Sequence, residues 1–233
     1  MLLAPAATLA GPPYVTDDPE PVPLRHWELY LATQDGGGGG AAGGTAPHVE
    51  VNYGAAPDLQ LHAIVPLAWS RAPGGATEVG LGDIELGAKL RFIAEGEARP
   101  MVGIFPLVEL PTGSEQRGLG EGRPRVFIPV WLQKSFGPWS TYGGGGYWLE
   151  TGSPRRGWWL FGWQAQRRVA EWASLGAELF YETAPDAASR ASLRFDLGAV
   201  IDLSDAHHLL FSGGHSLAGE AGWQSYAAYL LTL

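Results

Sequence analysis

Ionisable side chains recur at every second position in several stretches of this sequence. In residues 83–92, DIELGAKLRF, the charged residues alternate with apolar ones, and residues 24–33 and 48–54 show a similar alternation. A helix would scatter these charges around its circumference, whereas an extended strand places them on one face. Side chains on such a face can neutralise one another or line a pore that selects solutes. The pattern therefore predicts strands with one polar face and one apolar face.

We expect the polar face to point into an enclosed interior, where its residues would line a path for a solute. The expected lining residues are His26, Glu28, Tyr30, His48, Glu50, His62, Glu85, Lys89, Arg91, Glu109, Arg125, Phe127, Trp131, Tyr142, Trp158, Glu178, Arg194 and Asp196. One hypothesis is a narrow lumen filled by charge-paired side chains. The other is a pore lining in which charges and aromatic walls choose the solute. For any single residue the first hypothesis is favoured.

Three histidines fall on successive expected strands and are candidates for a metal site. His26, His48 and His62 could converge, but a metal site needs close ligand geometry and supporting contacts around the ligands. The sequence gives no sign of either, so we expect no metal and no cofactor.

A hydrolytic triad can be assembled on paper from Ser212, His215 and Asp202. No nucleophile elbow or other local signature surrounds Ser212, and a chain with many polar residues contains such triples by chance. We therefore expect no enzyme, and an outer-membrane hydrolase remains a minor alternative.

Two glycine runs need separate explanations. Gly36 to Gly40 precede no helix and no GK[ST] motif, so they predict a mobile outer loop rather than a phosphate-binding loop. The run 142–147, YGGGGY, lies within an expected strand, where glycine weakens the strand unless something else needs the space. Either the glycines make room in the lumen for a ligand or for Trp131, or aromatic side chains of neighbouring strands cover them.

The alternation predicts twelve strands: 24–34, 47–55, 58–70, 82–94, 100–110, 124–135, 138–149, 157–168, 171–183, 190–202, 207–216 and 223–233. Short turns near 56–58, 96, 137–138, 170 and 204–205 alternate with longer connections such as 35–46, 71–81 and 111–123. Outer-membrane barrels combine short periplasmic turns with long outer loops, and an even strand count places both termini on the periplasmic side. The predicted fold is all-β, a twelve-stranded antiparallel up-and-down transmembrane β-barrel.

A soluble β-sandwich or soluble barrel also alternates, with its apolar residues facing inward. Two features favour the membrane. Aromatic residues such as Trp69, Phe92, Trp159 and Trp163 lie near strand ends, as in the interfacial girdles of membrane barrels. The last strand, ending in SYAAYLLTL, has an apolar face that suits closure of the ring, because an open apolar edge would invite aggregation.

Composition excludes several other classes. The 233 residues include 34 glycines, 18 prolines and no cysteine, which excludes a helical protein and a disulfide scaffold. The net charge of −9 argues against a nucleic-acid partner. No apolar stretch approaches the roughly 20 residues that a membrane helix needs.

The chain is expected to have three parts. Residues 1–10 are interpreted as the remnant of a signal peptide, residues 11–23 as an extended N-terminal periplasmic segment, and residues 24–233 as the outer-membrane barrel. Asp17, Asp18 and Glu20 belong to the second part. If that segment were instead tucked into the lumen, it would act as a plug.

Several motifs along the whole chain, from Gly11 to Leu233, resemble a known family. They are GPPYVTDDPEP (11–21), GLGDIELGAKLRF (80–92), FPLVELPTGS (105–114), IPVWLQKSFGPWSTYGGGGYW (128–148), GWQAQRRV (162–169) and HHLLFSGG (207–214). They resemble bacterial meta-pathway phenol degradation proteins, also described as outer-membrane transporters. Many barrels of this kind end in Phe, whereas this chain ends in Leu233.

The resemblance implies an outer-membrane channel for passive or facilitated passage of small hydrophobic or aromatic compounds. It implies outer-membrane lipids, such solutes and the barrel assembly machinery as partners, and it brings no catalytic motif. The alternative is a structural or partner-binding outer-membrane barrel with a plugged lumen.

Overall fold

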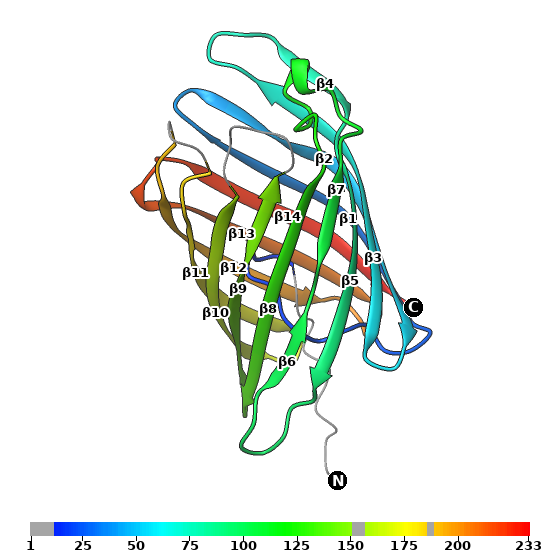
Figure 1. The fold of residues 1–233 in the computed structure, drawn as a ribbon. Coiled ribbons are helices and arrows are strands. Elements are labelled where there is room, and N and C mark those ends of the chain that lie inside the picture. Colours follow the sequence, from blue (N-terminus) through cyan, green and yellow to red (C-terminus); the bar gives the residue numbers. More distant parts are fainter. Residues whose placement is uncertain (1–11, 151–156, 186–188) are drawn as a thin grey trace.

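The computed structural model describes residues 12–150, 157–185 and 189–233, and these residues form a closed antiparallel β-barrel (Figure 1). The expected signal-peptide remnant, residues 1–10, lies outside the described residues. The strands are β1 (Trp27–Gly38), β2 (Ala41–Ala56), β3 (Leu59–Arg71), β4 (Thr77–Leu81), β5 (Ile84–Ile93), β6 (Met101–Ile104), β7 (Leu107–Leu110), β8 (Arg125–Phe136), β9 (Trp139–Glu150), β10 (Trp158–Ala170), β11 (Ala173–Glu182), β12 (Ser192–Asp202), β13 (His207–Gly219) and β14 (Trp223–Thr232).

These fourteen strands occupy twelve positions in the wall. β4 and β5 both pair with β3 and together form one position, interrupted at residues 82–83. β6 and β7 both lie between β5 and β8 and form another, interrupted at residues 105–106. The ring closes where β1 pairs with β14, from Glu28 opposite Thr232 to Gly37 opposite Trp223. The predicted twelve-stranded up-and-down barrel is confirmed.

The two faces of the wall lie as the alternation predicted. On β10 the side chains of Trp159, Phe161 and Trp163 are exposed on the outside, while Gln164 is completely buried inside. On β5, Leu86, Leu90 and Phe92 are exposed and Lys89 is buried. An exterior of this kind suits hydrocarbon rather than water.

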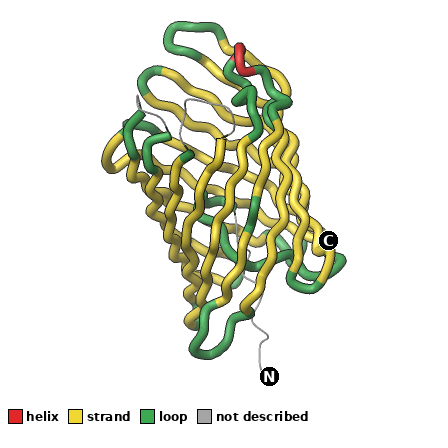
Figure 2. The backbone as a smooth tube through the Cα atoms, in the orientation of Figure 1, coloured by secondary structure: helices red, strands yellow, loops and turns green. Residues whose placement is uncertain are grey.

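The barrel has two distinct ends (Figures 1 and 2). We call the end with the turns at residues 57–58, 137–138 and 171–172 and with Leu233 the turn end. The opposite end, with the hairpin at residues 39–40 and the connection 111–124, is the loop end. The connection 111–124 contains the one helix of the described residues, the 3₁₀ turn η1 (Glu115–Arg117). No helix within those ranges is long and apolar enough to cross a membrane.

Two expected loops are wrong. Residues 35–46 form the ends of β1 and β2 with a tight turn at Gly39 and Gly40, and part of the expected loop 71–81 is β4. Gly39 and Gly40 have φ angles of +61° and +87°, which suit the tight turns that match strand twist. The glycine run therefore makes a hairpin turn rather than an irregular loop.

Candidate functional site

The N-terminal residues 12–24, here called segment 12–24, run through the interior of the barrel (Figure 1). Thr16 and Asp18 are completely buried there. The segment leaves beside β2, where Leu24 pairs with Gly54. The sequence left two placements for this part of the chain, an extended periplasmic segment or a plug in the lumen. The structure places it in the lumen, so the expectation of an extended periplasmic segment is corrected. The cause is a set of polar contacts with the barrel wall.

Glu178 of β11 holds the first part of the segment. Its two carboxylate oxygens accept hydrogen bonds from the backbone N–H groups of Val15 and Thr16, at 2.8 and 2.9 Å. The Ser212 hydroxyl of β13 donates to the Pro13 carbonyl. Buried backbone N–H groups need hydrogen-bond partners, so Glu178 is an anchor for backbone that would otherwise lie buried without them.

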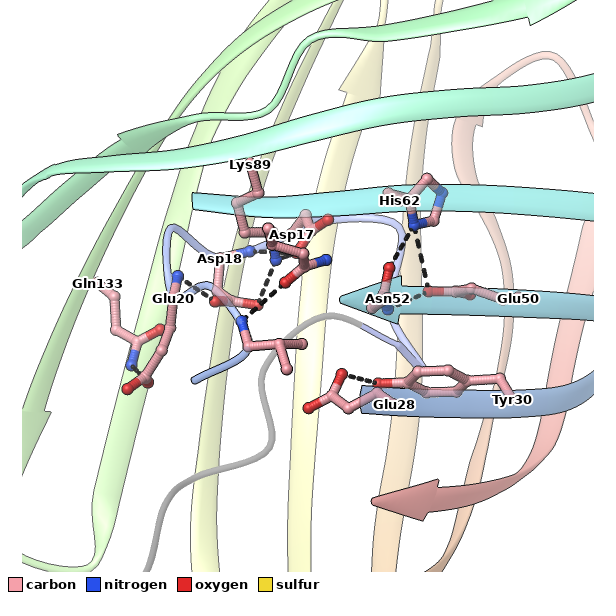
Figure 3. Close-up of polar contacts among 12 residues, drawn as sticks. Asp17, Asp18, Glu20, Glu28, Tyr30, Glu50, Asn52, His62, Lys89 and Gln133 are labelled. Carbon is pink, nitrogen blue, oxygen red and sulfur yellow. Dashed lines mark hydrogen bonds and ion pairs between the residues drawn. The ribbon is translucent and has the colours of Figure 1, made fainter. Parts of the chain in front are cut away.

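Lys89 of β5 holds the middle of the segment (Figure 3). Its ammonium lies 3.0 Å from the Asp17 carboxylate and 3.4 Å from that of Asp18. Burial raises the pKa of the Asp18 carboxyl well above its usual range, and the Lys89 ammonium opposes this. Burial also raises the pKa of Glu20, whose carboxylate accepts a hydrogen bond from Gln133 at 3.3 Å. The segment is thus held by side chains that were expected to face the lumen.

Five inward glycines make room for the segment. A Cβ atom at Gly162 would overlap Thr16, and one at Gly54 would overlap the Pro23 backbone. A Cβ atom at Gly103 would lie 2.9 Å from Pro19, and one at Gly176 or Gly198 would lie 2.5 or 2.7 Å from the Tyr14 hydroxyl. These five positions were not identified from the sequence. The available signal was their place on the inward side of the alternation, because glycine within a strand marks close approach of another group.

The inward faces of β1, β2 and β3 carry a polar network in two parts (Figure 3). The ring of His62 bonds Asn52 at 2.7 Å through Nδ1 and Glu85 at 2.9 Å through Nε2. Asn52 also donates to Glu50 at 2.9 Å, and on β1 the Tyr30 hydroxyl donates to Glu28 at 3.0 Å. For these residues the contacts support the hypothesis of a charge-paired lumen.

A buried aromatic cluster adjoins this network, because the Phe105 ring meets the His62 ring edge-on at 5.2 Å. Phe105, Phe127, Trp131 and Leu160 form a buried cluster, and Val15 of segment 12–24 packs against it. Aromatic and polar side chains therefore both contact segment 12–24 in the lumen.

The glycine run of β9 is covered by aromatic side chains from both neighbouring strands. Inside the barrel, Trp131 lies against Gly144 and Phe127 against Gly146. Outside, the rings of Trp163 and Phe161 cover Gly143 and Gly145 in the same way. The sequence left two explanations for these glycines, space in the lumen for a ligand or for Trp131, and cover by aromatic side chains of neighbouring strands. The structure shows the cover by neighbouring strands, and Trp131 is one of the covering residues. Aromatic rings over strand glycines also fix the register of the strands.

The expected lining residues occupy three environments. Those buried in the interior are Tyr30, His48, Glu50, His62, Lys89, Phe127, Trp131, Tyr142, Glu178 and Asp196. Those half-buried on the same inward face are Glu28, Glu85, Arg91, Glu109, Arg125, Trp158 and Arg194. His26 precedes β1 and is exposed at the turn end, so it does not belong to the wall.

The three histidines considered for a metal are held apart by their own partners. His26 contacts the Leu24 carbonyl, His48 contacts Thr45, and His62 lies in the polar network. Across residues 12–150, 157–185 and 189–233 there is no group of three or more His, Cys, Asp or Glu side chains with metal-site geometry.

The hypothetical triad is not assembled. The Ser212 hydroxyl donates to Pro13 inside the lumen, whereas His215 is exposed and stacks edge-on against Phe195. Asp202 bonds His208 at 2.8 Å instead of His215. Because residues 212 and 215 differ by an odd number, the regular strand turns their side chains to opposite faces of the wall.

Cavities lie at both ends of the barrel. The turn-end cavity, about 720 Å³, is lined in part by Val22, Pro23 and His26. Two loop-end cavities of about 640 and 550 Å³ include Arg194 in the first and Arg125 in the second. Segment 12–24 contributes to the turn-end cavity and fills the lumen above it.

Comparison with known proteins identifies related sequences and folds. A family model described as "Putative MetA-pathway of phenol degradation" matches residues 45–231. An outer membrane channel from Pseudomonas putida F1 is 17% identical, with 93% of this chain and 98% of that chain covered and a TM-score of 0.76. The translocator domain of the autotransporter NalP from Neisseria meningitidis is 14% identical, with coverage of 88% and 87% and a TM-score of 0.58.

The KdgM porin is 7% identical, with 88% of this chain and 98% of that chain covered and a TM-score of 0.62. No curated protein matches the sequence. At these identities the solved structures share the fold of this chain.

Proposed function

We propose a function from the premise that this chain belongs to the family described as "Putative MetA-pathway of phenol degradation". The protein would be a channel for small, flat aromatic or hydrophobic compounds, closed in this structure by segment 12–24. The observation that carries the proposal is a membrane barrel whose lumen is occupied by its own N-terminal residues through polar contacts.

The barrel itself is an outer-membrane barrel of a Gram-negative bacterium. Its strand positions are even in number, the ring is closed, and large apolar side chains cover the outside. This is the architecture of bacterial outer-membrane proteins. The similar fold of an outer membrane channel from Pseudomonas putida supports the assignment of a channel role. Insertion by the barrel assembly machinery and contact with outer-membrane lipids belong to the same proposal.

Passage requires segment 12–24 to shift. The segment is held by a lysine, a glutamate and single hydrogen bonds, which water can replace when the segment moves. Its removal would join the loop-end and turn-end cavities along the aromatic wall of Phe127, Trp131 and Tyr142. That wall, together with the phenol pathway in the family description, supports an aromatic solute.

The test is flux through the purified barrel in lipid vesicles. Permanently charged aromatic probes, benzyltrimethylammonium and benzenesulfonate, are suitable because, unlike weak acids and bases, they have no neutral form that crosses lipid. We expect faster entry, and a higher conductance in planar bilayers, for a variant lacking residues 12–23 than for the full chain. Both samples must first show the mobility change on boiling that a folded barrel gives in a denaturing gel.

The plugged lumen also suits the alternative, a barrel that binds a partner through its loops and passes nothing. The same experiment separates the two. If the folded deletion variant conducts no ions and admits neither probe, the channel proposal is wrong and the structural barrel remains.

A further inference from the structure

Two consecutive backbone N–H groups of segment 12–24 occupy one carboxyl group of the barrel wall. Val15 and Thr16 donate to the two carboxyl oxygens of Glu178 at 2.8 and 2.9 Å. The side chain of Val15 packs at the same time against the buried cluster that contains Phe127 and Trp131. A pair of hydrogen-bond donors and an apolar group therefore meet the wall at one place.

Glu178 has a further acceptor beside it on each neighbouring strand. Gln164 of β10 and Asp196 of β12 lie directly opposite Glu178 in the register of the wall. Residues that lie opposite one another in antiparallel strands share a face, so all three side chains point into the lumen. All three are buried, and Oε1 of Gln164 and Oδ1 of Asp196 have no hydrogen-bond partner among the residues that the structure describes.

The donors of the wall near this place are already in use. The Gln164 amide donates to Gln166 at 3.3 Å, and Gln224 donates to the second oxygen of Asp196. The guanidinium of Arg194 donates to Gln224 at 3.4 Å. A buried acceptor without a partner is costly, so a molecule that brings donors to this place is favoured over one that brings only acceptors.

We propose that Gln164, Glu178 and Asp196 form a docking site for aromatic compounds that carry two adjacent hydrogen-bond donors, and that Val15 and Thr16 occupy the place of such a compound. Its ring would replace the Val15 side chain against the buried cluster. Its donors would replace the two backbone N–H groups on Glu178. The inference rests on the proposed function, because the compound must enter the lumen, and it adds a preference for donor-bearing solutes.

Competition between the compound and the segment links docking to opening. A compound that binds only where the segment has left shifts the population toward the open state. Its apparent affinity for the full chain is lowered in proportion to the fraction of molecules that are open. Removal of the segment should therefore tighten binding at this place, whereas it should leave binding elsewhere on the barrel unchanged.

The test is direct binding in lipid nanodiscs, measured by fluorine NMR line broadening on the full chain and on the variant lacking residues 12–23. The probes are 4-fluorocatechol, which has two adjacent hydroxyl groups, and 4-fluoro-1,2-dimethoxybenzene, in which both hydroxyl groups are methylated. Empty nanodiscs correct for partition into lipid, and samples are kept under argon because catechols oxidise in air.

In the deletion variant we expect the catechol to bind about 5- to 100-fold more tightly than the dimethyl ether, the usual effect of leaving a buried acceptor without its partner. The catechol should also bind the deletion variant more tightly than the full chain. The difference is about tenfold if the segment has left the lumen in about one full-chain molecule in ten.

Matched variants of the deletion form separate Glu178 from the rest of the lumen. Glu178→Gln replaces one acceptor by a donor, so it should remove most of the preference for the catechol. Glu182→Gln makes the same change four residues further along the same face of β11 and should keep the preference. Gel mobility before and after boiling confirms that each variant is folded.

The inference is overturned if the dimethyl ether binds the deletion variant as tightly as the catechol, or if neither compound binds. It is also overturned if deletion of residues 12–23 leaves catechol binding unchanged, or if Glu178→Gln and Glu182→Gln have the same effect. Flux through the deletion variant without this preference would remove the docking site and leave the channel. The preference without flux would leave the site and remove the channel.

Discussion

Lys89 shows at the scale of one residue how the lumen is filled. Its side chain is 4% exposed and meets Asp17 and the completely buried Asp18, two residues that lie about seventy positions earlier in the chain. A buried charge is costly without a partner, so the wall and the segment each neutralise a charge of the other. The sequence predicted ion pairs among the side chains of the wall. Lys89 shows that ion pairs also join the wall to segment 12–24.

Lys89→Met should loosen the segment and destabilise the barrel. Removing one partner of a buried ion pair typically costs about 3–5 kcal/mol, because the other charge stays buried. We expect a lower urea midpoint for loss of the unboiled gel band, together with a higher conductance. Lys134→Met is the control, because Lys134 pairs with Glu95 at the turn end with both side chains partly exposed. There the expected cost is about 0–1 kcal/mol, and equal effects at the two sites would contradict the role given to Lys89.

At the scale of one element, β9 depends on its glycines. Gly144 has a φ angle of +152°, a region that favours glycine, and a Cβ atom there would overlap the Val130 carbonyl and crowd the Trp131 ring. The run 143–146 is therefore a structural adaptation to large rings on β8 and β10.

Gly144→Ala should lower the free energy of unfolding by about 1–3 kcal/mol, the usual cost of an extra methyl group in a packed site. The temperature at which the folded gel band disappears measures the effect. Gly213→Ala on β13 is the matched control, because the nearest atom to its added Cβ lies at 3.6 Å. A variant at position 144 as stable as the one at position 213 would contradict this account of the glycine run.

Strands were predictable and the segment was not, for physical reasons. A strand buries one face, so polar and apolar residues alternate within a short stretch of the sequence such as 83–92. The place of segment 12–24 depends on partners such as Glu178, which is 163 positions from Val15. No local pattern around Val15 encodes that contact. The hairpin at residues 39–40 was missed because a glycine run is typical of both an irregular loop and a tight turn.

At the scale of the whole molecule, the exterior must face hydrocarbon. Leu197 lies at the middle of β12 with 61% of its surface exposed, and Leu203 lies in the following turn with 59% exposed. Leu197→Arg should lower the free energy of unfolding by about 2–4 kcal/mol, as expected for a basic residue near the middle of the bilayer. Leu203→Arg should cost about 0–1 kcal/mol, because the ends of the barrel reach the interface. Urea unfolding in lipid vesicles compares the two, and equal small effects would indicate that the exterior faces water.

Control of the lumen by segment 12–24 is tested most directly by a reversible covalent lock. The sequence contains no cysteine, so Thr16→Cys with Gly162→Cys creates a single possible disulfide. An ideal Cβ at position 162 lies 3.0 Å from the Thr16 Cβ, so a shift of about half an ångström reaches disulfide geometry. In planar bilayers the oxidised double variant should stay closed, and reduction with dithiothreitol should produce open-channel events that neither single variant shows on the same treatment. Identical conductance before and after reduction, with the disulfide verified, would contradict the account.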